Sequence, residues 1–371
     1  MHRIEADELL ALMALTRVQL VGNYTTKNLI GYCGSAREVF KQTKQRLLKI
    51  PGVGAGTVEN ILAFNDFKSI EPELDFIDNH QIKVAAYYQQ EYPYRLKDIP
   101  DAPVLLFSLG DIDFNVDRTI GIVGTRKNTT YGKQFTEKLV EELKPYNVTI
   151  ISGMAYGIDI IAHKASLKNE IPTIGVVAHG LDRVYPAVHT GVAKQMIKSG
   201  GAIATEHLSG TIPDRENFPK RNRIVAGMID ALVVVETDIK GGSMITAKLA
   251  ISYDREVSAL PGRTEDGYSK GCNYLIKSHQ ASMIECADDL AKWMNWDLKK
   301  RTPEKQFTLP IDLHPDHLEV FGVIREKGRI ELDTLLQTVN LSSSRLAFVL
   351  LELEFRNLIL SLPGKVYQLI R

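Results

Sequence analysis

Small and basic residues follow two apolar stretches of the sequence in a pattern typical of an anion-binding site. Gly124, Thr125 and Arg126 complete the stretch TIGIVGTR, and Ser152 and Gly153 end the stretch VTIISG. When such a turn joins a strand to a helix, backbone N–H groups and the positive end of the helix dipole face the ligand. An arginine adds a fork-shaped phosphate donor. We therefore expect these turns to hold a phosphate-bearing ligand.

A third turn and a basic helix strengthen this expectation. The third turn follows ALVVV and contains Lys240, Gly241, Gly242 and Ser243. The stretch NFPKRNRIVAG places Lys220, Arg221 and Arg223 in the first turns of a predicted helix. Positive charge there opposes the helix dipole, so a phosphate partner would explain it. We expect these side chains to be exposed; the alternative is a basic face that contacts only solvent.

Two aromatic residues near these turns suit a nucleic-acid ligand. Phe218 lies beside the basic residues, and Tyr156 follows the second turn. An exposed aromatic ring stacks on any base, so it binds single strands with little sequence preference. The alternatives are that Phe218 makes a hydrophobic contact at the helix start and that Tyr156 packs in the core.

The sequence gives little support for a cofactor, a metal or a catalytic base. A dinucleotide-binding turn needs the pattern GxGxxG, and here Gly121 and Gly124 are followed by no glycine until Gly132. Asp159 and His163 are four residues apart on a predicted helix, but no third metal ligand is evident nearby. His179 follows the strand-like GVVA, where we expect it to position backbone rather than act as a base. We predict no cofactor, no metal and no catalytic residue.

The positions of these motifs predict an α/β fold. From Val104 onward, short β-branched runs alternate with amphipathic helical patterns, as in a parallel sheet covered on both faces. The predicted domains are a helical domain (1–85), an extended Rossmann-like, doubly wound domain (86–297), a linker (298–312) and a winged-helix domain (313–371). The carboxyl ends of the parallel strands would bring the three turns together in one crevice.

Composition indicates an ordinary soluble protein. Lys plus Arg and Asp plus Glu both number 45 among 371 residues, so no global positive field marks the chain as a nucleic-acid binder. Cys33, Cys272 and Cys286 are scattered and match no zinc spacing. No apolar run is long enough to cross a membrane. These features predict a cytoplasmic protein without a membrane partner.

Seven motifs, in order, resemble the DNA-processing protein A family, also called the DNA-protecting or Smf family. They run from about Tyr92 to Leu290 and read EYPYRLKDIPDAPVLLFSLGD, GIVGTRKNTTYG, ISGMAYGIDIIAHKAS, GVVAHGLDRVYP, ENFPKRNRIVAG, GGSMITAKLA and LPGRTEDGYSKGCNYLI. The resemblance implies a non-enzymatic protein that binds and protects single-stranded DNA and loads the recombinase RecA in natural transformation and recombination. It also implies a homodimer.

Carried over by position, the resemblance supports the residues identified above. Arg126 matches the arginine of the family's GxR turn, Phe218 with Arg221 and Arg223 matches its FPxRNR segment, and Gly241 to Ser243 match its GGS turn. The flanking domains vary within the family and inherit less.

The flanking domains carry weaker signals. The stretch LLKIPGVGAGTVENI resembles a helix-hairpin-helix, in which Gly52 and Gly54 would expose N–H groups to a DNA phosphate. A purely structural turn explains it equally well. The winged helix is predicted from three helical stretches followed by LILSLPGKVYQLI, a hairpin that turns at Pro363-Gly364. It has seven basic and seven acidic residues, and only Arg345 lies near the groove-facing end of its recognition helix. We therefore expect an accessory or protein-contact role for it.

Two other functions are compatible with the same sheet. A nucleotide-cleaving enzyme of the lysine-decarboxylase-like phosphoribohydrolase type needs a PGGxGTxxE motif. Here Lys240 replaces the proline, Met244 the later glycine, and Lys248 lies roughly where the catalytic glutamate would be. A cation there cannot act as the required carboxylate. A transcriptional regulator acting through the winged helix is disfavoured by the neutral recognition helix.

Overall fold

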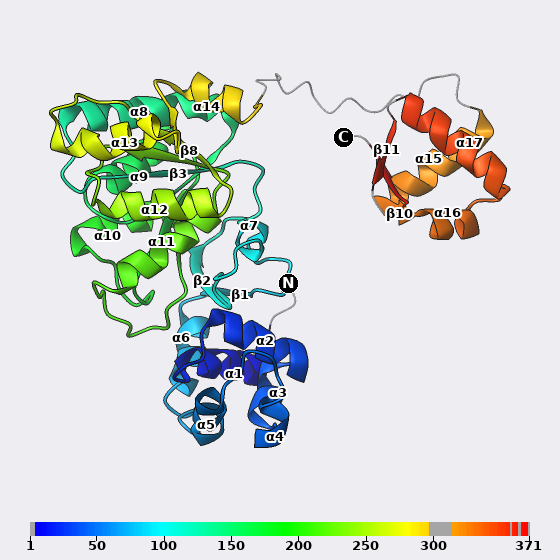
Figure 1. Ribbon diagram of the computed structural model, residues 1–371, viewed down its shortest axis with the longest axis horizontal. Coiled ribbons are helices and arrows are strands. Elements are labelled where there is room, and N and C mark those ends of the chain that lie inside the picture. Colours follow the sequence, from blue (N-terminus) through cyan, green and yellow to red (C-terminus); the bar gives the residue numbers. More distant parts are fainter. Residues whose placement is uncertain (1–3, 297–313, 357, 363–364, 370–371) are drawn as a thin grey trace. The chain divides into compact units, whose positions relative to one another are not determined.

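The computed structural model describes residues 4–296, 314–356, 358–362 and 365–369 (Figure 1). It divides into two compact units, residues 1–298 and 299–371, which are described separately below. The predicted linker (298–312) and the predicted turn at Pro363-Gly364 lie outside the described residues.

The first unit is built on a nine-stranded sheet with the order β1-β2-β6-β5-β4-β3-β7-β8-β9. β1 pairs antiparallel with β2, and β2 with β6, whereas neighbouring strands from β6 to β9 are parallel. The strands are β1 (Lys83–Ala86), β2 (Leu105–Gly110), β3 (Thr119–Gly124), β4 (Thr149–Gly153), β5 (Thr173–Val176), β6 (Ala202–Thr205), β7 (Ala231–Val235), β8 (Glu256–Ala259) and β9 (Ser282–Met283). The chain adds β4, β5 and β6 on one side of β3 and then returns to add β7 and β8 on the other side, as in a doubly wound fold.

Helices cover both faces of the parallel part of the sheet (Figure 1). Successive residues of the central strands enter different cores: Val233 packs with α8, α9 and α14, whereas Leu232 and Val234 pack with α11, α12 and α13. This two-sided burial explains the continuous apolar runs in the sequence. The α-helices from α7 onward are α7 (Tyr94–Lys97), α8 (Thr130–Leu143), α9 (Ile158–Lys168), α10 (Thr190–Lys198), α11 (Asn217–Gly227), α12 (Gly242–Ser252), α13 (Lys270–Lys277) and α14 (Ala287–Trp293). Short 3-10 turns span η1 (Lys144–Tyr146), η2 (Ala187–His189) and η3 (Gly267–Ser269).

The N-terminal helices belong to the same compact unit as the sheet. They share a core with Ala86, Val104, Leu105 and Phe107 of the antiparallel edge. β1 spans the predicted boundary between residues 85 and 86. This shared core fixes the helical region against the sheet. Its helices are α1 (Ala6–Arg17), α2 (Asn23–Cys33), α3 (Ala36–Phe40), α4 (Lys44–Leu47), α5 (Ala55–Ala63) and α6 (Glu71–Asn79).

A buried ion pair fastens the segment before β3 to the amino ends of β3 and β7. Arg95, on α7, is 2% exposed; its Nε donates to Asp230 Oδ1 (2.6 Å) and its Nη2 to Asp230 Oδ2 (2.8 Å). The same guanidinium donates to the carbonyls of Val116 and Asp117. Asp230 also accepts from the N–H of Thr119. The pair is thus fully hydrogen-bonded, as a buried pair must be.

The second unit has the arrangement of a winged helix. Three helices precede an antiparallel hairpin, as predicted, and a short strand that the sequence did not predict completes a sheet of order β10-β12-β11. Its core contains Phe321, Leu346, Val349 and Leu353. The elements are α15 (Pro315–Lys327), β10 (Arg329–Glu331), α16 (Leu332–Thr338), α17 (Ser343–Phe355), β11 (Ile359–Leu362) and β12 (Val366–Leu369). Throughout the described residues, no helix combines the length and apolar character needed to span a bilayer.

Arg95→Ala is expected to lower the free energy of unfolding by about 3–5 kcal/mol, because it removes a buried guanidinium and leaves the partly buried Asp230 carboxylate without its cation. Urea unfolding followed by circular dichroism measures this. Lys97→Ala, an exposed change on the same helix, is the control and should alter stability by no more than about 0.5 kcal/mol. Equal effects of the two substitutions would contradict a structural role for the ion pair.

Candidate nucleic-acid interface

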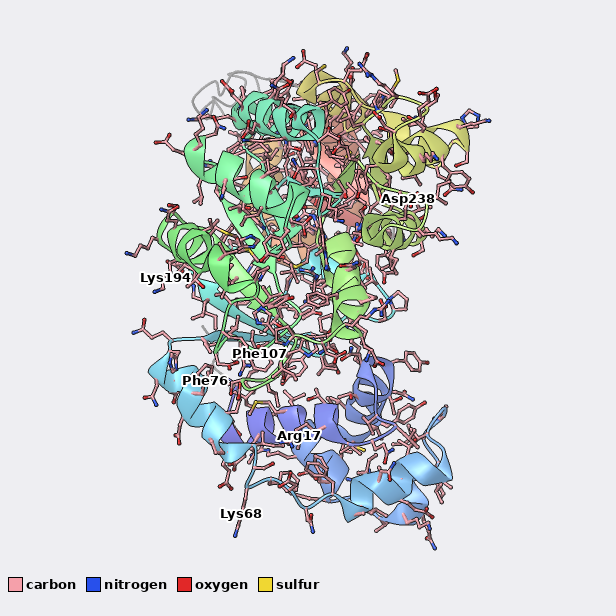
Figure 2. The ribbon with its side chains drawn as sticks, turned by 90° about the vertical axis from the view of Figure 1, so that its left-hand side faces the viewer. Arg17, Lys68, Phe76, Phe107, Lys194 and Asp238 are labelled. Carbon is pink, nitrogen blue, oxygen red and sulfur yellow. The ribbon has the colours of Figure 1, made fainter. Side chains whose placement is uncertain are left out.

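The three predicted turns lie at the carboxyl ends of three neighbouring strands in the centre of the sheet. β4, β3 and β7 are neighbours and parallel, so the residues after Gly153, Gly124 and Val235 emerge at the same end. Figure 2 labels Asp238 in the turn after β7. The strand order therefore brings the three turns to the same end of the sheet, although they do not share one crevice.

The helix that follows the first turn does not offer its N-terminus to a ligand. Glu236, buried at the end of β7, accepts from the backbone N–H of Thr129 (2.8 Å) and from its hydroxyl. Thr129 is the N-cap of α8, so a protein carboxylate already lies at the positive end of this helix. The expectation that this helix end faces a phosphate is wrong, and Arg126 is left as the candidate anion-binding group of the turn.

Arg126 instead forms part of an aromatic and cationic surface. Its exposed guanidinium lies over the ring of Phe218, 5.5 Å from the centroid. The Phe218 ring lies 5.9 Å from that of Tyr185. Tyr156, 50% exposed, lines the same small pocket of about 50 Å³. We call this set, Arg126, Tyr156, Tyr185 and Phe218, the aromatic pocket.

Arg221 lies beneath the aromatic pocket rather than on its surface. It is only 6% exposed, and its Nη1 donates to the carbonyl of Val176 at the end of β5. A Cβ on Gly153 would lie 2.6 Å from both terminal guanidinium nitrogens and 2.5 Å from Asp159 Oδ2. Gly153 thus leaves space that the Arg221 guanidinium and the Asp159 carboxylate border from two sides. The expectation of an exposed Arg221 is wrong, because the helix turns this side chain toward the strand ends.

The charges of Arg221 and Asp159 each oppose the pKa shift that burial causes in the other residue. Burial lowers the pKa of Arg221, and the Asp159 carboxylate opposes that shift. Burial raises the pKa of Asp159, and Arg221 opposes that shift in turn. A buried guanidinium keeps its proton, so Arg221 is charged and the nearby Asp159 carboxylate offsets that charge.

Lys220 and Arg223 lie on a different face of α11 from Phe218 and Arg221. Lys220 is exposed, and Arg223 pairs with Glu206. Both line a second, larger groove rather than the aromatic pocket. The structure therefore separates the predicted basic cluster into two groups, because residues two apart on a helix point in different directions.

The remaining predicted turn residues have mainly structural surroundings. Ser152 is buried and donates to the carbonyl of Ile122 (2.6 Å). Gly124 approaches the carbonyl of Val235 and Ile158 too closely for a side chain. Thr125 Oγ1 accepts from the N–H of Lys127 (3.1 Å).

The third turn lies at the carboxyl end of β7, as predicted, but it does not line the aromatic pocket. Gly241 is the N-cap of α12, Lys240 and Gly242 are exposed, and Ser243 is buried. A side chain at Gly241 would collide with the Thr237 hydroxyl. Glycine is therefore needed here for local packing, whatever else the turn does.

Two histidines near the site are engaged in the fold. His163 is buried, with ring nitrogens 2.7 Å from Thr173 Oγ1 and from the carbonyl of Gly153, and burial lowers its pKa to about 4. His179 Nδ1 contacts the carbonyl of Gly180 (2.8 Å), and its Nε2 accepts from the N–H of Tyr185 (3.1 Å). His179 thus positions backbone, and it holds Tyr185 beside Phe218. Among the residues that the structure describes, no three His, Cys, Asp or Glu side chains gather as a metal site.

Sequence reasoning missed Tyr185 as a member of the site. The residue stands in the loop between β5 and α10, just before Pro186, and its ring is 47% exposed. A tyrosine held before a proline is restricted to extended backbone, which is a weak signal for a fixed surface side chain.

The predicted second contact forms the expected turn. Gly52 has a φ of +77°, which favours glycine, and Gly54 is the N-cap of α5. Both are exposed, while Val53 between them is buried. Contact of this turn with DNA stays a prediction. In the winged helix, Arg345 is paired with Asp316 (2.7 Å), which reduces its availability for a groove.

A doubly wound sheet with aromatic and cationic side chains at its carboxyl edge defines a Rossmann-like protein with a surface suited to nucleic acid. The family model described as DNA recombination-mediator protein A matches residues 83–295, and the chain belongs to this family. The Bacillus subtilis DNA processing protein DprA is 36% identical over 66% of this chain and 82% of its own length. The Synechocystis protein Smf is 29% identical over 96% of this chain and 97% of its own.

Two solved structures are also similar. The DNA processing protein A of Streptococcus pneumoniae superposes with a TM-score of 0.64 and 27% identity, covering 78% of this chain and 98% of that one. The DNA processing protein A of Helicobacter pylori, described for its unique single-stranded DNA binding mode, gives a TM-score of 0.52 and 31% identity. It covers 58% of this chain and 96% of that one.

Gly153→Ala is expected to destabilise the fold by about 1–3 kcal/mol, because the added methyl group must displace Arg221 or Asp159. Gly191→Ala is the matched control: it lies in α10, where a Cβ meets nothing within 4 Å, and it should stabilise by about 0.5–1 kcal/mol. Urea unfolding compares the two. A Gly153 variant as stable as the parent would show that the Arg221 space is not tightly filled.

Proposed function

We propose that this protein is a non-enzymatic, single-stranded DNA-binding mediator of recombination. The observation that carries the proposal is the aromatic pocket, where the Arg126 guanidinium and the rings of Phe218, Tyr185 and Tyr156 form one open surface. Aromatic faces stack bases and a guanidinium binds phosphate, and neither requires a particular sequence. The family membership and the single-stranded DNA binding of the Helicobacter pylori relative support this reading.

The size of the pocket favours binding over catalysis. A volume of about 50 Å³ accommodates one or two water molecules, not an enclosed nucleotide. A strand that lies across the surface, with one group inserted, fits better than a nucleotide held for bond cleavage. Lys248 is exposed on α12 and offers no carboxylate for the rival phosphoribohydrolase reaction. We therefore propose that the protein is not an enzyme and needs no cofactor.

The proposed partners rest on the family resemblance. We propose that the DNA-bound protein delivers its strand to the recombinase RecA in the cytoplasm, in natural transformation, recombination or both. A homodimer is the proposed working form. The winged helix, formally neutral and with Arg345 already paired, is assigned an accessory or protein-contact role.

The parent protein is expected to bind oligo-dT more tightly than a duplex of equal length. Affinity should fall as salt rises, with a slope of about −0.7 per phosphate contacted, because bound phosphates release counterions. Fluorescence anisotropy over a salt series measures both quantities. Equal or tighter duplex binding would contradict a single-strand function.

Arg126→Ala is expected to weaken oligo-dT binding by about 1.5–3 kcal/mol, the range for a charge-assisted hydrogen bond. Its thermal midpoint should stay near that of the parent, because its exposed guanidinium contributes little to folding. Arg345→Ala in the winged helix is the matched arginine control and should bind like the parent. If Arg345→Ala weakens binding and Arg126→Ala does not, the DNA site lies elsewhere.

The enzyme alternative has its own test. Incubation with nucleoside monophosphates should release no free base, as followed by chromatography. Base release that depends on the protein and exceeds the buffer blank would support the phosphoribohydrolase reading instead.

A further inference from the structure

A second groove lies between the helical region and the sheet, within the first compact unit. Its volume is about 750 Å³, and its walls come from the end of α1, the start of α2, strand β2, the loop after β6 and helix α11. Arg17 of α1 and Phe107 of β2, both labelled in Figure 2, are among its lining residues. We call this space the helical-region groove.

Positive charge predominates in the helical-region groove. Arg17, Lys220 and Arg223 line it, and Glu206 is the one carboxylate among its lining residues. Lys27, on the same face of α2 as the lining residue Asn23, adds a further nearby cation. Burial lowers the pKa of Lys27, and the charge of Arg223 lowers it further. Asp66 pairs with Arg17 and Asp101 acts on Lys27 from outside the groove lining, and cations held this close together gain stability from a bound anion.

Two polar atoms at this groove have no partner. Arg223 Nη1 and His207 Nε2 are both buried, and neither makes a hydrogen bond within the protein. Such atoms are rare in native proteins and commonly indicate a missing water, ion or ligand. Arg223 also lines the groove, and its guanidinium always carries its positive charge.

The groove and the aromatic pocket share walls. Asn217, Lys220 and Arg223 face the groove from α11, whereas Phe218 and Arg221 line the pocket from another face of the same helix. The loops beside them are also joined, since the N–H of Gly180 donates to the carbonyl of Thr211 (3.1 Å). A helix is about 10 Å wide, so a strand leaving one site reaches the other within a few nucleotides.

We propose that the helical-region groove binds the phosphates of the same single DNA strand, beyond the nucleotides held at the aromatic pocket. The helical region thereby lengthens the DNA site, and Arg17 is its contact from α1. The proposal rests on the proposed function. A strand suits this groove better than a single free phosphate, because the cations come from separate elements along a space much larger than one phosphate needs.

The test compares oligo-dT of about 4 and about 16 nucleotides, the lengths that bracket the site of one single-strand-binding domain. Arg17→Gln in the full chain should bind the longer oligonucleotide roughly tenfold more weakly and the shorter one like the parent. Its salt slope with the longer oligonucleotide should be smaller by about 0.7. Anisotropy titrations provide all of these values.

Arg37→Gln is the matched control. Arg17 and Arg37 have side chains that are both 42% exposed, and each pairs with a surface carboxylate, but Arg37 does not line the groove. It should bind both oligonucleotides like the parent. Glu206→Gln is expected to have the opposite effect to Arg17→Gln. Because it removes the one lining carboxylate, it should strengthen binding of the longer oligonucleotide only.

The outcomes separate this proposal from the proposed function. If the parent binds oligo-dT, Arg126→Ala weakens it, and Arg17→Gln and Glu206→Gln both match the parent, the groove proposal alone is wrong. If the parent binds neither oligonucleotide, both proposals are wrong. If sodium phosphate raises the thermal midpoint of the parent but not of Arg17→Gln while long-oligonucleotide affinity stays unchanged, the groove holds a free anion and the strand proposal is overturned.

Discussion

The arrangement of the site depends on one buried side chain, the guanidinium of Arg221. It occupies the space that Gly153 leaves open, donates to the end of β5 and lies near the Asp159 carboxylate. Removing a guanidinium from water is costly, so it is retained only where such partners surround it. Because the side chain is fixed, helix α11 is fixed against the strand ends. Phe218 is then held beside Arg126 on one face, and Lys220 and Arg223 are turned to the other.

A second constraint decides where phosphate binding can occur. In many open α/β sheets the ligand phosphate lies at a helix N-terminus after the first strand. Here Glu236 supplies that negative charge from within the protein. The turn keeps its shape without a ligand, and the candidate anion-binding groups are side chains at the surface. Side chains spread along a surface suit a long flexible polyanion better than one compact phosphate, which agrees with a strand as ligand.

The helical region is part of this surface because it shares a core with the sheet. Phe107 and Leu105 of β2 pack among the N-terminal helices, so α1 and α2 have fixed positions beside α11. A helical domain attached only by a linker would not form a defined groove there. The shared core therefore places the N-terminal region beside α11, which its helical pattern alone does not indicate.

The sequence by itself determined the parallel sheet, the three turns and the family. Continuous apolar runs are the local consequence of burial on both faces of a sheet, and small residues mark the turns that follow them. It also identified Arg126 and Phe218, which end up in contact. Only the tertiary structure decided which basic residues face the solvent. Arg221, Lys220 and Arg223 are nearly adjacent in FPKRNR, yet one is buried under the pocket and two face another groove. The sequence likewise did not show that Glu236 binds the N-terminus of α8 or that the Tyr185 ring lies beside Phe218. These contacts join residues distant in the chain, and strand order and helix rotation, which set them, are properties of the whole packed core rather than of any local pattern.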